Sequence, residues 1–211
     1  MASHFSRARV YSRTPDIGPP PEDHLDNHFL WEVRDNCDYA IRAFESMRDI
    51  AKTDPSSNSL LALAHMVLVF GANVVRTLDP PKAAPPTTKR RALRLRRQVH
   101  FSTTNLDRMR VARNHLEHFD ERLERFMTTP ATVERTVTIR RMVMDHEPGP
   151  ATIEGKGDKL FQPRFLKFLN TASWELIVID ERFSIPDIIA DLHSIRRSID
   201  EAEHALAQGD A

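Results

Sequence analysis

Apolar residues recur every three or four positions over five stretches of this chain, as they do along a helix with one buried face. Prolines and small polar residues, which favour breaks and helix caps, separate the stretches. Four prolines between residues 80 and 86 predict an irregular linker that extends to Thr88. The pattern predicts helices at about residues 22–53, 59–78, 89–97, 106–127 and 186–207.

A different pattern occupies the region before the last helix. Residues 136–139 alternate and are rich in β-branched side chains, and residues 164–170 and 173–179 resemble two strands joined by a turn. The expected fold is mainly α, a bundle of four to five helices with a small antiparallel β-hairpin or three-stranded insertion before the last helix. The expected organisation is a flexible arm at 1–20, a single domain at 21–207 with a β-containing elaboration at 131–184, and a tail at 208–211.

The fourth predicted helix carries polar residues that packing does not require. The apolar positions that form its core-facing stripe are Met109, Ala112, Leu116, Phe119, Leu123 and Phe126. The positions that face away from this stripe are Asn114, His118, Glu121 and Arg125. An arginine, an asparagine and a histidine therefore lie within one and a half turns, at Arg113, Asn114 and His118, and they are the clearest sign of chemistry in the chain.

The segment from Arg113 to His118 resembles the motif of HEPN domains, in which an arginine, a polar residue, three variable residues and a histidine follow one another on a late helix. These domains are small helical bundles found widely in toxin and defence ribonucleases. The resemblance implies metal-independent cleavage of RNA at a dimer interface. It also implies roles: Arg113 holds the scissile phosphate, Asn114 orients the site, and His118 moves the proton of the ribose 2'-hydroxyl or of the leaving oxygen.

These roles agree with the chemistry of the side chains. A guanidinium binds a phosphate through two parallel hydrogen bonds, and imidazole, with an ordinary pKa of about 6.5, transfers protons near neutral pH. Residues five apart are separated by about 140 degrees around an ideal helix. One helix therefore gathers Arg113 and His118 poorly, and this mechanism requires a homodimer in which two such helices meet across a two-fold axis.

The arginine-to-histidine spacing has little specificity by itself. It recurs at Arg110 to His115 and at Arg141 to His146, and only the match at Arg113 has a polar residue in second place. The alternative interpretation of the motif is a solvated helix face held by ion pairs between neighbouring turns.

Charge adds a local argument rather than a global one. Thirty basic and thirty acidic side chains cancel, so the net charge favours neither nucleic acid nor membrane binding. The run from Lys89 to Arg97 is nevertheless strongly basic. The candidate contacts to an RNA backbone are Arg90, Arg94, Arg97 and Arg110. The alternative is a solvated helix face that pairs with acids elsewhere.

Other classes of site are disfavoured. His115, His118 and Glu121 do not converge on one face of a helix, and the pair His24 and His28 supplies too few ligands, so no metal site and no cofactor is predicted. The single cysteine, Cys37, excludes an intrachain disulfide and is expected to be a small buried hydrophobe.

Localisation follows from the same kind of evidence. The first twenty residues lack the apolar run of a secretory signal. An organellar transit peptide is the alternative, since acids are absent before Asp16. The most apolar stretch, residues 60–75, is too short and too polar for a comfortable membrane span, so it predicts a buried helix. We expect a cytoplasmic protein.

Two functions from different classes remain. The first is a HEPN-like endoribonuclease of a toxin or defence type, a homodimer with RNA as substrate and an antitoxin-like protein as partner. The second is a non-catalytic helical scaffold or regulatory module of the same fold, which uses its hairpin for protein contacts.

Overall fold

The computed structural model describes residues 22–99, 103–128, 136–152 and 160–208. Within these residues the protein is mostly helical, with two small sheets before the last helix. The α-helices are α1 (Glu22–Thr53), α2 (Asn58–Leu78), α3 (Pro86–Gln98), α4 (Asp107–Glu117), α5 (Phe119–Thr128) and α6 (Ile185–Gln208), and a 3-10 turn, η1 (Thr103–Leu106), precedes α4. The strands are β1 (Thr136–Ile139), β2 (Met142–Met144), β3 (Ala151–Thr152), β4 (Leu160–Phe165), β5 (Lys167–Asn170), β6 (Glu175–Val178) and β7 (Glu181–Ser184).

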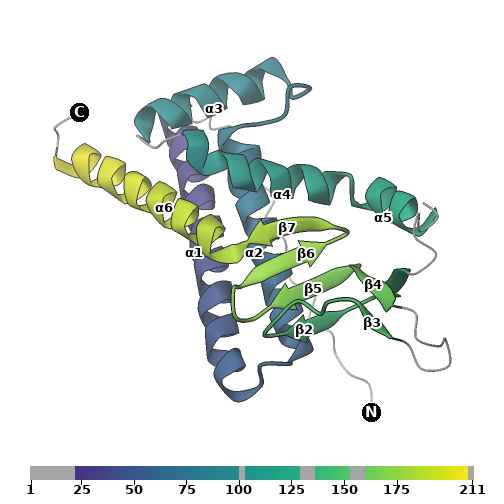
Figure 1. The fold of residues 1–211 in the computed structure, drawn as a ribbon. Coiled ribbons are helices and arrows are strands. Elements are labelled where there is room, and N and C mark those ends of the chain that lie inside the picture. The colour runs from purple at the N-terminus through teal and green to yellow at the C-terminus, as the bar shows by residue number, and fades with distance from the viewer. Residues whose placement is uncertain (1–21, 100–102, 129–135, 153–159, 209–211) are drawn as a thin grey trace, which may run out of the picture.

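Helices α1 and α2 form the long pair on which the other elements pack (Figure 1). Their bounds match the predicted helices to within one residue. The hydroxyl of Ser57 caps α2 by accepting a hydrogen bond from the backbone N–H of Ser59. Between the two helices, the side-chain amide of Asn73 donates to the buried amide oxygen of Asn36 at 3.1 Å. This bond offsets the free-energy cost of burying two polar groups at an apolar helix interface. It also helps to fix the register between α1 and α2.

Helix α2 lies at the centre of the molecule and contacts α1, α3, α4, α6 and the sheet. Gly71 lies where α2 and α4 approach each other closely. A side-chain carbon placed there would lie 3.2 Å from Cγ of Met109 and 3.7 Å from Cγ2 of Ile188 on α6. The absence of a side chain at this position therefore lets three helices meet.

Helix α3 begins at Pro86, three residues earlier than the sequence predicted. The expectation that the linker is irregular up to Thr88 was therefore wrong for its last three residues. Pro86 occupies the first turn of the helix, where a proline loses no hydrogen bond and its fixed φ suits the helix. Helix α3 lies across one end of the α1–α2 pair (Figure 1). Helix α6 agrees with its predicted bounds to within one residue at each end.

The β region contains more strands than predicted, and not all pairs are antiparallel. The expected hairpin is confirmed, since β5 pairs antiparallel with β6. However, β1 pairs parallel with β4, and β2 pairs parallel with β5. The two sheets have the orders β1-β4-β3 and β2-β5-β6-β7. Parallel pairing joins segments distant in sequence, which local patterns do not reveal.

The hairpin between β6 and β7 was missed because its turn has no glycine or asparagine and begins with an apolar isoleucine, which extends the pattern of the strand. Ile179 and Asp180 connect the strands, and both have positive φ, 48° and 64°. Two such residues match the type I′ turn, for which asparagine and glycine are the common choices. A β-branched isoleucine is strained in this conformation. Ile179 is buried within the main core, and this burial offsets part of the strain.

Two of the expected segments, the arm at 1–20 and residues 209–211 of the tail, lie outside the described residues. Gln208, placed in the tail by the sequence, ends α6. Among the described helices, α2 alone is long and apolar enough to cross a membrane by length and composition. Half of its apolar window is buried in the structure, as expected of a core helix.

The contact at Gly71 generates a stability prediction. Gly71→Leu is expected to lower the free energy of unfolding by about 1–3 kcal/mol, because the new side chain overlaps Met109 on α4. Ala62→Leu, on the exposed side of the same helix, is the control and should change the free energy of unfolding by less than about 0.5 kcal/mol. Chemical denaturation measures both. Equal stability of the two variants would contradict the close approach.

Candidate functional site

The predicted motif helix is divided at His118. Helix α4 ends at Glu117 and α5 begins at Phe119, while His118 has the non-helical dihedrals φ −110° and ψ 25°. The prediction of one helix over residues 106–127 is therefore wrong. The apolar stripe continues across the break, since Leu116 and Phe119 both pack against the main core. A continuous stripe gives no local signal of the break, so the sequence alone suggested an unbroken helix.

Arg113 is buried, whereas helical geometry placed it on a flank of the polar face. The residue is only 7% exposed. Its Nη1 donates to the backbone carbonyl of Asp79 at 2.8 Å, and its Nη2 donates to Oδ1 of Asn114 at 3.1 Å. Its Nε lies 3.8 Å from a carboxylate oxygen of Glu117 and has no hydrogen-bond acceptor among the residues that the structure describes. The guanidinium thus links α4 to the C-terminal end of α2 and orients the side chain of Asn114.

Asn114, on α4, and His118, directly after the end of α4, are both exposed. The backbone N–H of His118 donates to the carbonyl of Asn114 at 3.2 Å. The side chain of His118 is 58% exposed, and its Nδ1 lies 3.4 Å from a carboxylate oxygen of Glu121. Val111, one turn before Asn114, is also exposed. The structure therefore joins the side chains of Asn114 and Arg113, and it links His118 to Asn114 through the backbone alone. Arg113 is buried whereas His118 is exposed, so the two are not gathered into one site.

Asp79, the residue that caps the C-terminus of α2, connects the motif helix to the basic helix. Its carboxylate accepts hydrogen bonds from Arg96 of α3 at 3.3 Å and from Nε of Arg110 of α4 at 2.6 Å. Its carbonyl accepts from Arg113. Three cations from two helices thus converge on one residue, which holds α3 beside α4.

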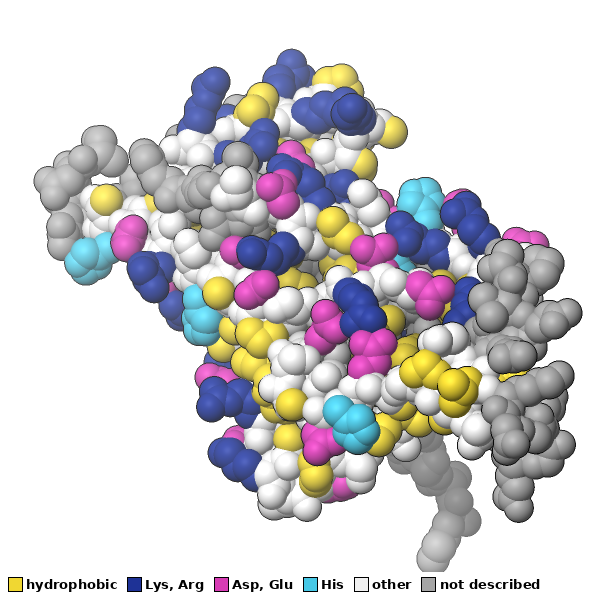
Figure 2. Space-filling view, viewed as in Figure 1, with side chains coloured by type: hydrophobic (Ala, Val, Ile, Leu, Met, Phe, Trp, Pro, Cys, Tyr) yellow, Lys and Arg dark blue, Asp and Glu magenta, His cyan; other side chains and the backbone are white. Residues whose placement is uncertain are grey.

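The four arginines predicted to contact RNA fall into two pairs. Arg94 forms a two-pronged ion pair with the buried Asp26 at 2.7 and 2.9 Å, and Arg110 pairs with Asp79. Arg90 and Arg97 lie on the exposed side of α3, with no ion pair among the described residues. Figure 2 shows Lys and Arg side chains gathered over α3. Of the four, Arg94 and Arg110 would have to give up an ion pair to bind a phosphate, whereas Arg90 and Arg97 would not give up an ion pair to any described residue.

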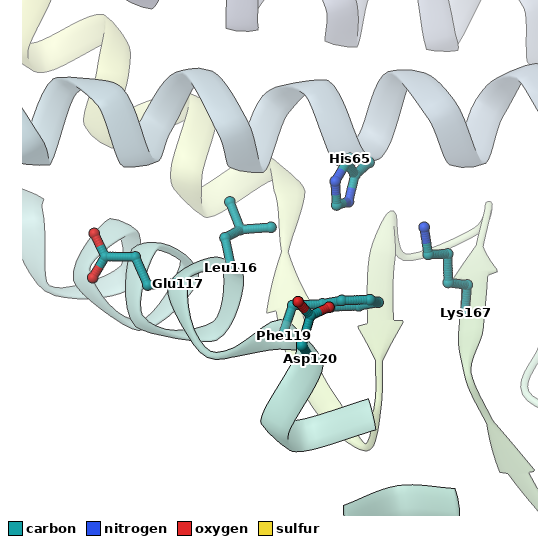
Figure 3. Close-up of a pocket in the computed structure, with 6 residues that line it drawn as sticks. All are labelled: His65, Leu116, Glu117, Phe119, Asp120 and Lys167. Carbon is teal, nitrogen blue, oxygen red and sulfur yellow. The ribbon is translucent and has the colours of Figure 1, made fainter. Parts of the chain in front are cut away.

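The sequence did not reveal a pocket of about 330 Å³ at the junction of α4 and α5. The residues that line it are His65, Leu116, Glu117, Phe119, Asp120 and Lys167 (Figure 3). They come from α2, the α4–α5 segment and β5, so no local motif joins them. Two features were visible in the sequence: a histidine within the apolar run of α2, and a lysine at the start of a strand.

Burial changes the ionisation of the cationic side chains at this pocket. The pKa of Lys167 is lowered, chiefly by burial and then by the charge of Arg141. The pKa of His65 is lowered by burial and then by the charge of Lys167. His65 is therefore neutral near pH 7. Its Nδ1 is buried without a hydrogen-bond partner within the described structure.

His115, on the inner side of α4, is fully buried between two aromatic rings. Its ring centroid lies 5.4 Å from that of Phe183 and 6.3 Å from that of Phe119. Burial, followed by the charges of Arg122 and His65, lowers the pKa of His115 to about 4. Neither ring nitrogen has a partner among the described residues. His115 is thus a neutral core residue at physiological pH.

Other candidate residues take structural positions. Cys37 is buried, and burial raises the pKa of its thiol to about 12, so it remains protonated. The exposed His118 and the buried His115 lie on different sides of α4. Within the described ranges, no group of three or more His, Cys, Asp or Glu side chains is placed to hold a metal ion.

No family model, curated protein or solved structure matches this chain. Function must therefore be inferred from the motif and from the contacts of its residues.

The burial of His115 makes stability depend on pH. Its folded pKa of about 4 lies below the value of about 6.5 expected in the unfolded chain, so only the unfolded chain takes up the proton between these values. The contribution of His115 is complete above about pH 6.5 and is lost as pH falls, by roughly 2 kcal/mol at pH 5.

Denaturation at pH 7 and pH 5 measures this effect. His115→Leu should lose less stability on acidification than the wild-type protein, while the exposed-site control His193→Leu should behave like wild type. Identical losses in all three proteins would contradict the assignment.

Proposed function

We propose that this protein is a HEPN-like, metal-independent endoribonuclease of a toxin or defence type that acts as a homodimer. The observation that supports the proposal is the hydrogen bond from Arg113 to Asn114, together with the exposure of Asn114 and of His118. The side chains of Asn114 and His118 are thus open to a substrate, and packing requires neither of them.

The chemistry assigned to the motif is an attack of the ribose 2'-hydroxyl on the adjacent phosphorus. The new bond joins the 2'-oxygen to phosphorus, and the bond from phosphorus to the 5'-oxygen breaks, leaving a cyclic phosphate and a 5'-hydroxyl. His118 moves the proton, because imidazole serves as a general acid or base near neutral pH. Arg113 of the second copy holds the phosphate and supports its developing negative charge, and Asn114 orients the site.

A second copy of the chain is part of this proposal. Arg113 is buried whereas His118 is exposed, so a single chain does not bring both to one phosphate. The outward face of α4 with Val111 and Asn114, followed directly by His118, is exposed in the monomer and includes an apolar residue. Two such faces meeting across a two-fold axis would place residues of both copies in one cleft.

Helix α3 supplies the proposed path for RNA. Arg90 and Arg97 lie on its exposed side, and Asp79 holds α3 beside the motif helix. An RNA backbone bound along α3 would thus approach α4, and its affinity would fall as salt rises. A cytoplasmic location and an antitoxin-like partner belong to the same proposal.

The alternative is a non-catalytic scaffold or regulatory module. The observation that favours it is the burial of Arg113, whose hydrogen bonds to Asp79 and Asn114 serve to connect two helices. Under this alternative Arg113 stabilises the fold, and Asn114 and His118 form a solvated surface.

Cleavage of diverse RNAs in the presence of a chelator distinguishes the two functions. His118→Ala should reduce the rate about 100-fold or more, since general acid–base catalysis contributes at least that much. His146→Ala is the matched control, because His146 is exposed and follows Arg141 at the same spacing. It should cleave like wild type.

A lack of cleavage by the wild type, or equal cleavage by both variants, would favour the scaffold. Solution mass must accompany the assay, because the proposal requires a dimer. Folding of each variant is checked by thermal denaturation.

A further inference from the structure

The pocket between α2, the α4–α5 junction and β5 contains two opposite charges that do not pair. Lys167 and Asp120 both line it, yet neither forms an ion pair within the described residues. The ammonium group of Lys167 instead lies near the aromatic ring of Phe119, with Nζ 6.0 Å from the ring centroid. The half-buried Lys167 would therefore gain from an anionic ligand group, and the exposed Asp120 offers a carboxylate acceptor at the edge of the pocket.

The fold keeps Lys167 at the pocket. Lys167 and Leu169 alternate with Phe168 along β5, so they share the face of the sheet that turns toward the helices. Leu169 belongs to the main core, whereas Phe168 belongs to a separate cluster on the other face. The half-buried ammonium group lacks a carboxylate partner, and burial lowers its pKa. An anion from a ligand would supply the missing partner.

The pocket also offers two flat surfaces. In Figure 3 the ring of Phe119 is seen edge-on, with one face turned toward His65 on α2. His65 is neutral near pH 7, and its buried Nδ1 has no partner in the described structure. Aromatic rings of this kind stack the unpaired bases of single-stranded RNA, and carboxylates accept hydrogen bonds from base edges.

We propose that this pocket binds a guanine nucleotide, with the base between His65 and Phe119, its N–H edge on Asp120 and its phosphate on Lys167. The choice of a nucleotide rests on the proposed ribonuclease function. The volume of about 330 Å³ is near the lower end of the usual range for small-molecule sites. In an RNA substrate this pocket would select the base next to the phosphate that is cut.

Guanine is preferred over the other bases because of its donor pattern. The two oxygens of a carboxylate match two adjacent N–H donors, and guanine presents such a pair at N1 and N2. Adenine and cytosine offer a single exocyclic amine beside an acceptor nitrogen, and uracil offers one N–H between two carbonyl groups. Asp120 would therefore leave an unfavourable acceptor contact with each of these bases.

Because the pocket lies next to the motif in the chain, one RNA substrate would contact both. Phe119 and Asp120 directly follow His118 in sequence. Glu117, within the motif segment, also lines the pocket and pairs with Arg76 of α2 at 3.4 Å. A base held over Phe119, with its 5'-phosphate on Lys167, would leave its 2'-hydroxyl and 3'-phosphate to approach the motif.

Binding of the four nucleoside 5'-monophosphates to the full chain tests the proposal by calorimetry or by NMR titration. GMP should bind at least about tenfold more tightly than AMP, CMP or UMP. Asp120→Asn should remove this preference. Lys167→Gln should weaken GMP but not guanosine, which lacks the phosphate. Glu124→Gln on the exposed side of α5 and Lys52→Gln on α1 are controls that should bind like wild type.

Equal binding of all four nucleotides, or GMP binding that survives Asp120→Asn, would overturn the proposal. The absence of GMP binding at millimolar concentrations would do the same. These outcomes are separable from failure of the nuclease function. GMP binding without RNA cleavage would support the guanine pocket and contradict the nuclease function. RNA cleavage that is lost in His118→Ala, with no preference for guanine, would support the nuclease function and contradict the guanine pocket.

Discussion

The burial of α2 is the constraint on which the rest of the structure depends. Its apolar run packs against α1, α4, α6 and the sheet, and three residues interrupt it. Asn73 bonds to Asn36 across the α1 interface, Gly71 admits Met109 of α4, and His65 lines the pocket. Each interruption of the hydrophobic pattern thus coincides with a specific feature of the fold, and the contact at Gly71 sets how closely the motif helix approaches α2.

The C-terminus of α2 organises the candidate site in the same way. Asp79 accepts hydrogen bonds from α3 and α4 through its carboxylate, and its carbonyl anchors Arg113. The buried arginine therefore has two connections, one to the scaffold and one to Asn114 at the surface. A residue held this firmly orients its neighbours well, and under the proposed mechanism it would meet a phosphate only where a second chain or a local rearrangement completes the site.

The helices could be predicted closely because a buried face imposes its period on the local sequence, as the bounds of α1, α2 and α6 show. The break at His118 could not, since the apolar stripe runs through it from Leu116 to Phe119. The burial of Arg113 depends on a carbonyl 34 residues away. The pocket joins three distant segments, and the parallel strand pairs join others. Such contacts are properties of the folded chain rather than of any local pattern.

The central claim is that two copies of the chain complete one catalytic site. Mixing two inactive variants, Arg113→Gln and His118→Ala, tests it most directly, provided that each is folded and dimeric. If the arginine and the histidine of one site come from different copies, half of the dimers in an equal mixture carry one intact site of two. RNA cleavage should then return to about one quarter of the wild-type rate. A mixture as inactive as its separate components would contradict the composite site.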